Sequence, residues 1–371
     1  MYSRSDGGTL PPFLRAGALG RRSQHFRELS WFAQDSRAPR LLSWHSVMHQ
    51  KQTMDVQLPP HPSSLQHLRA RDTAGWLCMG ATIAVTVAGV WLSIAEMPVR
   101  WLIGQLLLAA SLIQWFIVLH ECGHGTLFST PWLNAPAGQL AGFFALIPFD
   151  CWKRVHNRHH KWTGWQDVDP TTALLTAAPA GRLARGLVNV CWAYWIPLFS
   201  ILYRLNNFWN MPRLMGLFRT RAVRRRLIAN AVVLATIYIV GLVMIGPATL
   251  ARLFGLAILL ALITEDMLLI SQHTHVPMGR SCGARVTPYP AIEQEHFTRS
   301  LRFPAWLSRL LLHFDAHELH HMYPFVPGHR LSEIPYSPAN EVSCWRWIHA
   351  ARAMPGEVLL FQNRDQSGYD V

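Results

Sequence analysis

The sequence predicts an all-α integral membrane protein with four transmembrane helices arranged as two hairpins. Half of the 371 residues are hydrophobic and only 15% are charged, whereas soluble proteins usually carry about a quarter charged residues. The apolar residues also gather in long blocks, which are separated by polar segments rich in arginine. Composition and pattern together indicate that part of this chain lies within a lipid bilayer.

Two uncharged runs predict the first hairpin. Residues 75–95 form a run of 21 residues and residues 101–119 a run of 19, and about 20 apolar residues in a helix cross the hydrocarbon core of a bilayer. The residues between the runs include Pro98 and predict a short turn. Because backbone polar groups inside a bilayer must be satisfied internally, two helices joined by a tight turn are the economical arrangement.

Two later runs predict the second hairpin. Residues 227–245 and 250–270 are mainly apolar, and Gly246-Pro247 separates them. Two further apolar segments are poorer candidates for a span, because residues 140–149 are too few and residues 187–203 are interrupted by a proline. We expect these two segments to be interfacial or re-entrant.

The arginines predict the orientation of the four spans. Residues 204–226 hold seven arginines, and the two hairpin turns hold very few. By the positive-inside rule, the N-terminus, residues 120–226 and the C-terminal part lie in the cytoplasm. The chain is then divided into a polar, partly disordered N-terminal segment (1–74), a membrane domain (75–335) and a C-terminal cytosolic tail (336–371).

The net charge and the cysteines limit the possible functions. A formal net charge of +13 is typical of proteins that bind nucleic acid, an anionic membrane face or an acidic partner protein. The long apolar blocks argue against nucleic acid, and we expect none to bind. None of the six cysteines forms a C-x-x-C pair, so neither a zinc ribbon nor a thioredoxin motif is indicated, and no disulfide is expected.

Three histidine clusters carry the strongest chemical signal. The first has the spacing H-x3-H and the other two have H-x2-H-H; their members are His120 and His124, then His156, His159 and His160, then His317, His320 and His321. Residues i, i+3 and i+4 of a helix are neighbours, so we expect each cluster to aim its imidazoles at a common point. Imidazole binds iron, copper, zinc and nickel, and eight histidines exceed the needs of one four-coordinate zinc ion. The sequence therefore predicts a two-metal site.

The clusters resemble the histidine boxes of the membrane fatty acid desaturase and hydroxylase superfamily. His120–His124 is similar to the first box of the acyl-lipid desaturases, Gln272–His275 to a segment that follows their last span, and His320–Pro324 to the end of their third box. The resemblance covers roughly residues 75–335. It implies a four-helix membrane unit with a cytosolic helical cap that holds the histidine boxes.

The resemblance also implies a non-haem di-iron centre with mainly histidine ligands. The eight box histidines would be ligands, and a ninth would come from the segment after the last span. His273 is the first choice for this ninth ligand and His275 the alternative. Iron rests on the resemblance alone, because an imidazole-rich site would by affinity favour copper.

Acidic residues near the boxes are candidates for supporting the ligands. Ligating histidines usually donate their second ring N–H to a carboxylate or a carbonyl. Asp169 and Asp315 flank the second and third boxes. Glu265 and Asp266 lie deep in an apolar run, where a charge is costly unless it is paired.

The implied activity is O2-dependent oxidation of an aliphatic acyl chain at the cytoplasmic membrane face, with fatty-acyl (acyl-lipid) desaturation as the first choice. The sequence has no cysteine motif for an iron–sulfur cluster, so electrons would come from a separate ferredoxin or cytochrome b5-like donor. Such donors are commonly acidic and suit a basic face.

One alternative function is that of a hydroxylase or ketolase-type oxygenase acting on an alkane, sterol or carotenoid. Another is a metal transporter, although its ligands would be expected at mid-membrane depth.

Overall fold

The computed structural model describes residues 58–176, 181–369 and 371, and these residues are mostly helical. Four helical stretches are long and apolar enough to cross a membrane: α2 (Asp72–Ser93), α3 (Pro98–His124), α9 (Arg221–Ile245) and the stretch Pro247–His273. Each of the four runs expected from the sequence falls on one of these stretches. The last comprises α10 (Pro247–Leu250), the π-helical η5 (Ala251–Gly255) and α11 (Leu256–His273).

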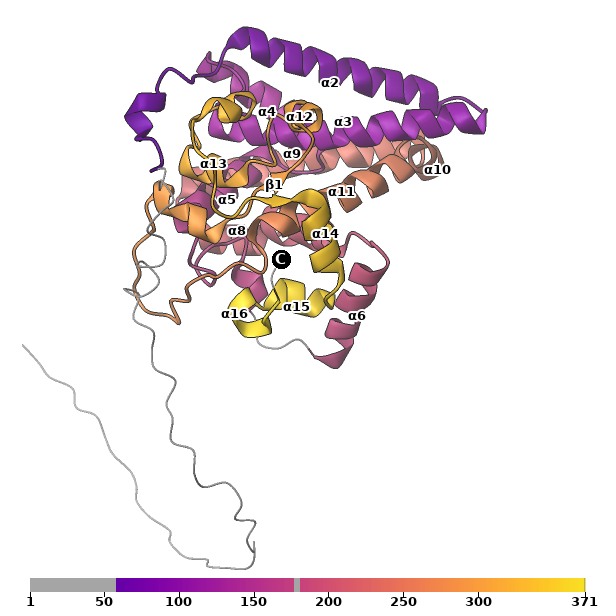
Figure 1. Ribbon diagram of the computed structural model, residues 1–371. Coiled ribbons are helices and arrows are strands. Elements are labelled where there is room, and N and C mark those ends of the chain that lie inside the picture. The colour runs from indigo at the N-terminus through magenta and orange to yellow at the C-terminus, as the bar shows by residue number, and fades with distance from the viewer. Residues whose placement is uncertain (1–57, 177–180, 370) are drawn as a thin grey trace, which may run out of the picture. The chain divides into compact units, whose positions relative to one another are not determined.

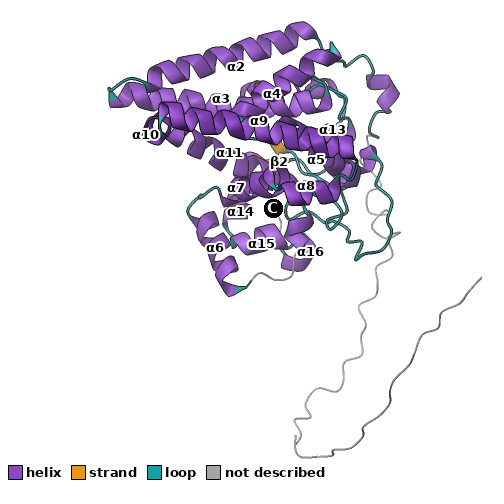
Figure 2. Cartoon of the chain, turned by 180° about the vertical axis from the view of Figure 1, so that it is seen from behind, coloured by secondary structure: helices purple, strands orange, loops and turns teal. Residues whose placement is uncertain are grey.

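Helices α2 and α3 lie side by side along their length (Figures 1 and 2). Glycine makes this close approach possible, because a Cβ atom on Gly104 would come within 2.6 Å of Ser93. Helix α3 begins with Pro98 in its first turn and ends at Gly125, which has a φ of 75°. The helix thus continues beyond the apolar run and carries the whole first histidine box on its last turns.

A buried amide joins the two long hairpins. The side chain of Gln105 on α3 donates to the carbonyl of Leu253 (2.7 Å) and accepts from the backbone N–H of Ala257 (3.0 Å). Both partners lie at the junction of η5 and α11, where the π-helical turn interrupts the regular hydrogen-bonding pattern. The buried amide of Gln105 therefore forms hydrogen bonds with backbone groups, as a polar group in an apolar interior must.

A bent helical segment contains residues 187–203, which were expected to be interfacial or re-entrant. Helix α6 (Arg182–Ala193) is followed by α7 (Leu198–Arg204) and the π-helical η4 (Leu205–Trp209), and the chain bends by 117° between them. The break falls at Pro197, which precedes α7. Proline lacks the N–H that a continuous helix would need here.

Shorter elements carry the other histidine boxes and the C-terminus. The helices are η1 (Pro62–Leu65), η2 (Pro131–Leu133), α4 (Asn134–Phe144), α5 (Phe149–Trp162), η3 (Ala173–Thr176), α8 (Met211–Leu217), η6 (Ala291–Phe297), α12 (Ala305–Leu310), α13 (His317–Met322), η7 (Gly328–Glu333), α14 (Cys344–Arg352), α15 (Gly356–Phe361) and α16 (Arg364–Ser367). One small exception to the all-α prediction is a parallel pair of two-residue strands, β1 (Leu301–Arg302) and β2 (Val342–Ser343).

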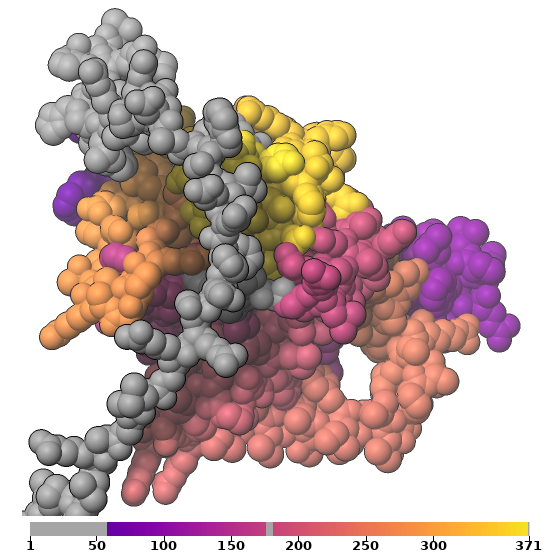
Figure 3. Space-filling model, turned by 90° about the horizontal axis from the view of Figure 1, so that it is seen from below, coloured from indigo at the N-terminus to yellow at the C-terminus, as the bar shows by residue number. Residues whose placement is uncertain are grey.

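The two ends of the described chain are packed. Leu65 and Leu68 are buried in one cluster with Leu319 and Tyr323, and the Tyr323 hydroxyl donates to the carbonyl of Pro60 at 2.7 Å. Figure 3 shows the C-terminal residues in yellow against α6, where the Glu357 N–H donates to the side chain of Asn189. Residues 1–57 lie outside the described residues, so the predicted disorder there stays a prediction.

Candidate metal centre

Four helices bring the histidines together. The first box lies on α3, the second on α5 and the third on α13, and His273 is the last residue of α11. The indole ring of Trp152 stacks on the imidazole of His156 with 4.2 Å between ring centres, which fixes the plane of that imidazole. Histidines that are far apart in the sequence therefore share one buried region.

The ring nitrogens form two groups. Those of His120, His124, His156 and His320 lie within 4.8 Å of one another, and so do those of His159, His273, His317 and His321. His160 belongs beside the first group, because its Nε2 atom lies 3.1 Å from that of His156 and 3.0 Å from that of His320. We name the first five histidines cluster 1 and the second four cluster 2.

The expectation that each box aims at a common point is wrong. In the second box His156 and His160 lie in cluster 1 and His159 in cluster 2, whereas in the third box His317 and His321 lie in cluster 2 and His320 in cluster 1. The reason is the helical angle of about 100° per residue. Residues i and i+4 are about 40° apart, but residue i+3 points about 100° away from residue i+4. Each H-x2-H-H box can therefore serve two positions.

The clusters fit two metal ions. The closest pairs of Nε2 atoms are 2.7–3.1 Å apart, and two nitrogens bound at right angles to one ion at about 2.1 Å would be about 3 Å apart. A neutral imidazole has one N–H and one lone pair. The buried Nε2 atoms of His120 and His321 have no hydrogen-bond partner among the described residues. A cation in each cluster would satisfy these nitrogens.

The protonation states suit metal binding. Burial, reinforced by neighbouring imidazoles, holds the pKa of His156, His160 and His320 well below its usual range. The same causes lower the pKa of His317 and His321. These imidazoles are therefore neutral at pH 7 and keep a lone pair for a metal ion.

Side chains approach the far sides of three rings, and two of these contacts are hydrogen bonds. His159 donates from Nδ1 to the Asp169 carboxylate at 2.6 Å, and His321 donates from Nδ1 to the side-chain oxygen of Gln294 at 2.9 Å. The Nδ1 atom of His120 lies 3.4 Å from a carboxylate oxygen of Glu121. The sequence pointed to Asp169 but not to Gln294, which lies far along the chain from every box and has no distinguishing pattern around it.

The other three acidic candidates contact residues other than the box histidines. Glu265 pairs with Arg204, Asp266 accepts from the backbone N–H of Ser200, and Asp315 accepts from the Ser308 hydroxyl. Among the described residues, only Asp169 of the four candidates forms a hydrogen bond with a histidine ring. Pairing within the apolar interior accounts for Glu265 without any role at the metal centre.

The two candidates for the ninth ligand lie in different surroundings. The Nε2 atom of His273 is 2.7 Å from that of His317 and 3.1 Å from that of His159. His275 has a φ of 58°, and its Nε2 atom contacts the hydroxyl of Ser367 at 2.7 Å. The end of α11 at His273 explains the difference, because the chain leaves the helix there.

A small cavity of about 40 Å³ borders both clusters. Its walls include His120 and His156 of cluster 1 and His159, His273 and His317 of cluster 2. The lining also includes two leucines, three threonines, Gln272 and five aromatic side chains: Phe116, Trp152, Phe199, Tyr203 and Phe314. A narrow space that borders both clusters and carries these aromatic side chains is suited to hold part of an aliphatic chain.

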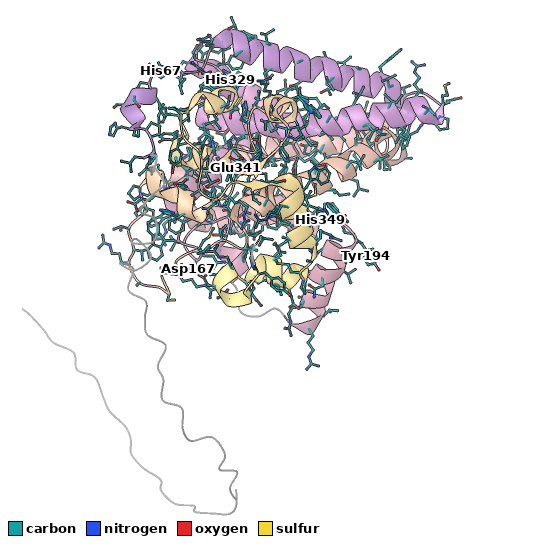
Figure 4. The ribbon with its side chains drawn as sticks, in the orientation of Figure 1. His67, Asp167, Tyr194, His329, Glu341 and His349 are labelled. Carbon is teal, nitrogen blue, oxygen red and sulfur yellow. The ribbon has the colours of Figure 1, made fainter. Side chains whose placement is uncertain are left out.

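We expect loss of the Asp169 carboxylate to weaken metal binding by about 10–100-fold, because a carboxylate behind a histidine orients the ring and raises its basicity. Titration of Asp169→Ala with a chelator, followed by metal analysis, measures the effect. Asp167→Ala is the matched control (Figure 4 labels Asp167), because that carboxylate accepts from Ser281 and Cys282 and not from a histidine. Equal metal retention by the two variants would contradict the prediction.

The chain is similar in sequence to one family of known proteins. A family model described as "Fatty acid desaturase" matches residues 96–340. Over 280 residues the chain is 24% identical to a probable fatty acid desaturase DES1 of Sorghum bicolor, covering 71% of this chain and 67% of the relative. Over 271 residues it is 23% identical to an acyl-lipid omega-3 desaturase (cytochrome b5) of the endoplasmic reticulum of Arabidopsis thaliana. This match covers 68% of this chain and 66% of the relative. It is 34% identical over 80 residues to an sn-1 oleoyl-lipid 12-desaturase of Picosynechococcus, covering 22% of each chain.

Proposed function

Because the chain belongs to the fatty acid desaturase family, we propose that it is a membrane-bound non-haem di-iron oxidoreductase that desaturates the acyl chain of a lipid. The observation that carries this proposal is the pair of histidine clusters, one set of ring nitrogens for each of two ions. Residues 75–335 would form the membrane domain with this centre. Relatives named as desaturases of fatty acids and acyl lipids support the substrate class.

We assign the iron ligands by cluster. One iron would be held by His120, His124, His156, His160 and His320, and the other by His159, His273, His317 and His321. His273 is preferred over His275 as the ninth ligand because its ring faces two other members of cluster 2. Iron in place of zinc or copper follows from the family, since imidazole binds all three.

The overall reaction balances with one O2 and two external electrons. A –CH2–CH2– unit loses two hydrogen atoms and becomes –CH=CH–, while O2 takes up these two hydrogens, two electrons and two protons to give two molecules of water. The iron ions would supply the activation of O2. The protein would hold the acyl chain in the narrow cavity beside both clusters, exclude water with its aromatic lining, and keep the ligand imidazoles neutral and oriented.

The site would lie at the cytoplasmic face of the membrane. Both histidine-bearing span ends, His124 on α3 and His273 on α11, lie at the end of their helix opposite the hairpin turns. The exposed arginines at the start of α9 are found at this same end of the spans. By the positive-inside rule that end faces the cytoplasm.

Product analysis tests the proposed reaction. With its redox partner in a host membrane, the protein should yield an acyl chain that is two mass units lighter. Mass spectrometry of total lipids detects this loss, and a box-histidine variant serves as the inactive control. A gain of sixteen mass units would indicate hydroxylation, and oxygen gained only by a sterol or carotenoid would contradict acyl desaturation.

A separate electron donor would dock on a basic surface behind the second histidine box. The three box histidines lie on one side of α5, and the other side carries the exposed Lys161 and the half-buried Arg154 and Arg158. No acidic residue occurs in residues 151–166 or 204–264. A helix with its side chains is about 10 Å across, so an acidic donor on this surface would be close to the clusters.

Charge reversal tests this docking surface. We expect Lys161→Glu to raise the KM for the protein donor about tenfold at low salt, because a like charge opposes the acidic partner. Desaturation driven by a small chemical reductant should be unchanged. Arg100→Glu is the control, since Arg100 lies near the other end of α3, against Trp91. An unchanged donor KM in Lys161→Glu would contradict the assignment.

A further inference from the structure

A second cavity, much larger than the one beside the clusters, is not lined by the clustered histidines. It has a volume of about 1260 Å³ and lies among α2, α3, α11, α12 and α14. Figure 1 shows α12 near α2 and α3, although α12 is far from both in the sequence. None of the nine clustered histidines lines it.

The geometry of α3 separates this cavity from the metal centre. Six side chains of α3 line the cavity: Leu107, Ala110, Ser111, Ile113, Gln114 and Glu121. At about 100° per residue all but Ile113 fall on one face of the helix, opposite Phe116 and His120, whereas Ile113 falls on the side of His120. The opposite face borders the small cavity beside the clusters. The two cavities therefore share no lining residue, and the large one lies mainly on the side of α3 that faces away from the clusters.

The walls of the large cavity call for an apolar occupant. The hydroxyl of Thr82 donates to the carbonyl of Cys78, and that of Ser111 donates to the carbonyl of Leu108. The Glu121 carboxylate accepts from the Thr126 hydroxyl and the Gly328 N–H. The polar groups of these lining residues thus have partners within the protein, and most of the remaining wall is aliphatic or aromatic. An occupant would gain its affinity from apolar burial.

The depth of the cavity matches one leaflet of a bilayer. Its lining runs along α2 from Ala74 to Val85, which is about 16 Å at 1.5 Å per residue. Half of a hydrocarbon core of about 30 Å is about 15 Å. An acyl chain of one leaflet would therefore fill the cavity from end to end.

Cationic and tryptophan side chains line part of the cavity. Arg309 and Trp306 of α12 and Trp345 of α14 are exposed and line the cavity, as does His329, which Figure 4 labels close to the start of α2. No acidic partner of Arg309 is found among the described residues. Tryptophan is typical of the membrane–water interface, and a guanidinium group suits a phosphate.

We propose that this cavity is a binding site for one membrane phospholipid, distinct from the substrate channel, with an acyl chain between α2 and α3 and the phosphate near Arg309. The lipid belongs to the same leaflet as the metal centre and is not turned over. It fills the space beside the α2–α3 hairpin, and so supports the helix whose opposite face carries the first histidine box.

Native mass spectrometry of the full-length protein, purified from membranes and exchanged into a detergent, tests the site. The wild-type protein should retain one phospholipid. The double variant Ala81→Trp/Val85→Trp places two indoles in the cavity and should lose it. Its matched control, Ile83→Trp/Val87→Trp, adds indoles to exposed positions of the same helix that do not line the cavity, and should retain the lipid. Arg309→Glu, at an exposed position, should also reduce retention without filling the cavity.

Each other outcome would overturn the proposal. Absence of retained phospholipid in the wild-type protein, or equal retention by the two double variants, would rule out a specific site. If the retained lipid itself loses two mass units when donor and O2 are supplied, the cavity is part of the substrate channel. Iron content and product formation are measured separately, so failure of this proposal is distinguishable from failure of the proposed desaturase activity.

Discussion

Replacing His320 with alanine is expected to abolish turnover and to lower the iron content of the purified protein from about two ions per chain. His320 comes from the third box, but its Nε2 atom faces His160 of the second box at 3.0 Å in cluster 1. His317, three residues earlier, faces His273 in cluster 2. We therefore expect His317→Ala and His320→Ala to disturb different ions although both belong to one box.

Metal analysis combined with iron Mössbauer spectroscopy distinguishes the two losses. His275→Ala serves as the control, because the His275 ring contacts Ser367, and it should keep most of its iron. One equivalent of zinc that is unaffected by His320→Ala would contradict the di-iron assignment. Identical spectra for His317→Ala and His320→Ala would contradict the exchange of ligands between boxes.

Replacing Arg204 with methionine is expected to destabilise the fold by about 3–5 kcal/mol, because it leaves a buried carboxylate without its counter-ion. Arg204 pairs with Glu265 on α11, and it also donates to the carbonyls of Ala145 and Ser200. Both members of the pair are buried. The pair joins the bent α6–α7 segment to a helix long enough to span the membrane.

Thermal unfolding in detergent measures the loss of stability. The double variant Arg204→Met/Glu265→Leu should recover most of it, since exchanging a whole buried pair for apolar side chains is often neutral. The iron content of the folded fraction should stay unchanged in both variants. If Glu265→Gln removed iron without changing stability, Glu265 would instead support the metal centre, as the sequence had suggested.

Hydropathy and spacing predicted the features that depend on local sequence. The four long helices follow from runs of apolar residues, and the second-box and third-box histidines lie on helices, α5 and α13, as their i, i+3, i+4 spacing requires. Asp169 was accessible to the same reasoning because it lies ten residues from His159 and contacts its ring. These are short-range relationships along one chain.

Long-range packing decided what the sequence did not predict. Gln294 supports His321, and Arg204 neutralises Glu265, through contacts between segments separated by 27 and 61 residues. The spacing within a box separates His159 and His320 from the other rings of their boxes, but which cluster each ring joins depends on how α5 and α13 face each other. The same is true of the large cavity, since its walls come from both hairpins and the C-terminal part.

The exchange of histidines between α5 and α13 also constrains the order of biosynthesis. Cluster 1 requires His320 and cluster 2 requires His317 and His321, so both need a helix that is synthesised after every proposed span. A nascent chain that ends before residue 317 offers neither ion a full set of ligands, whatever its degree of insertion. Loading of the proposed ions would therefore follow synthesis of residues 317–321, and an inserted protein truncated before them would leave the ribosome without a complete metal site.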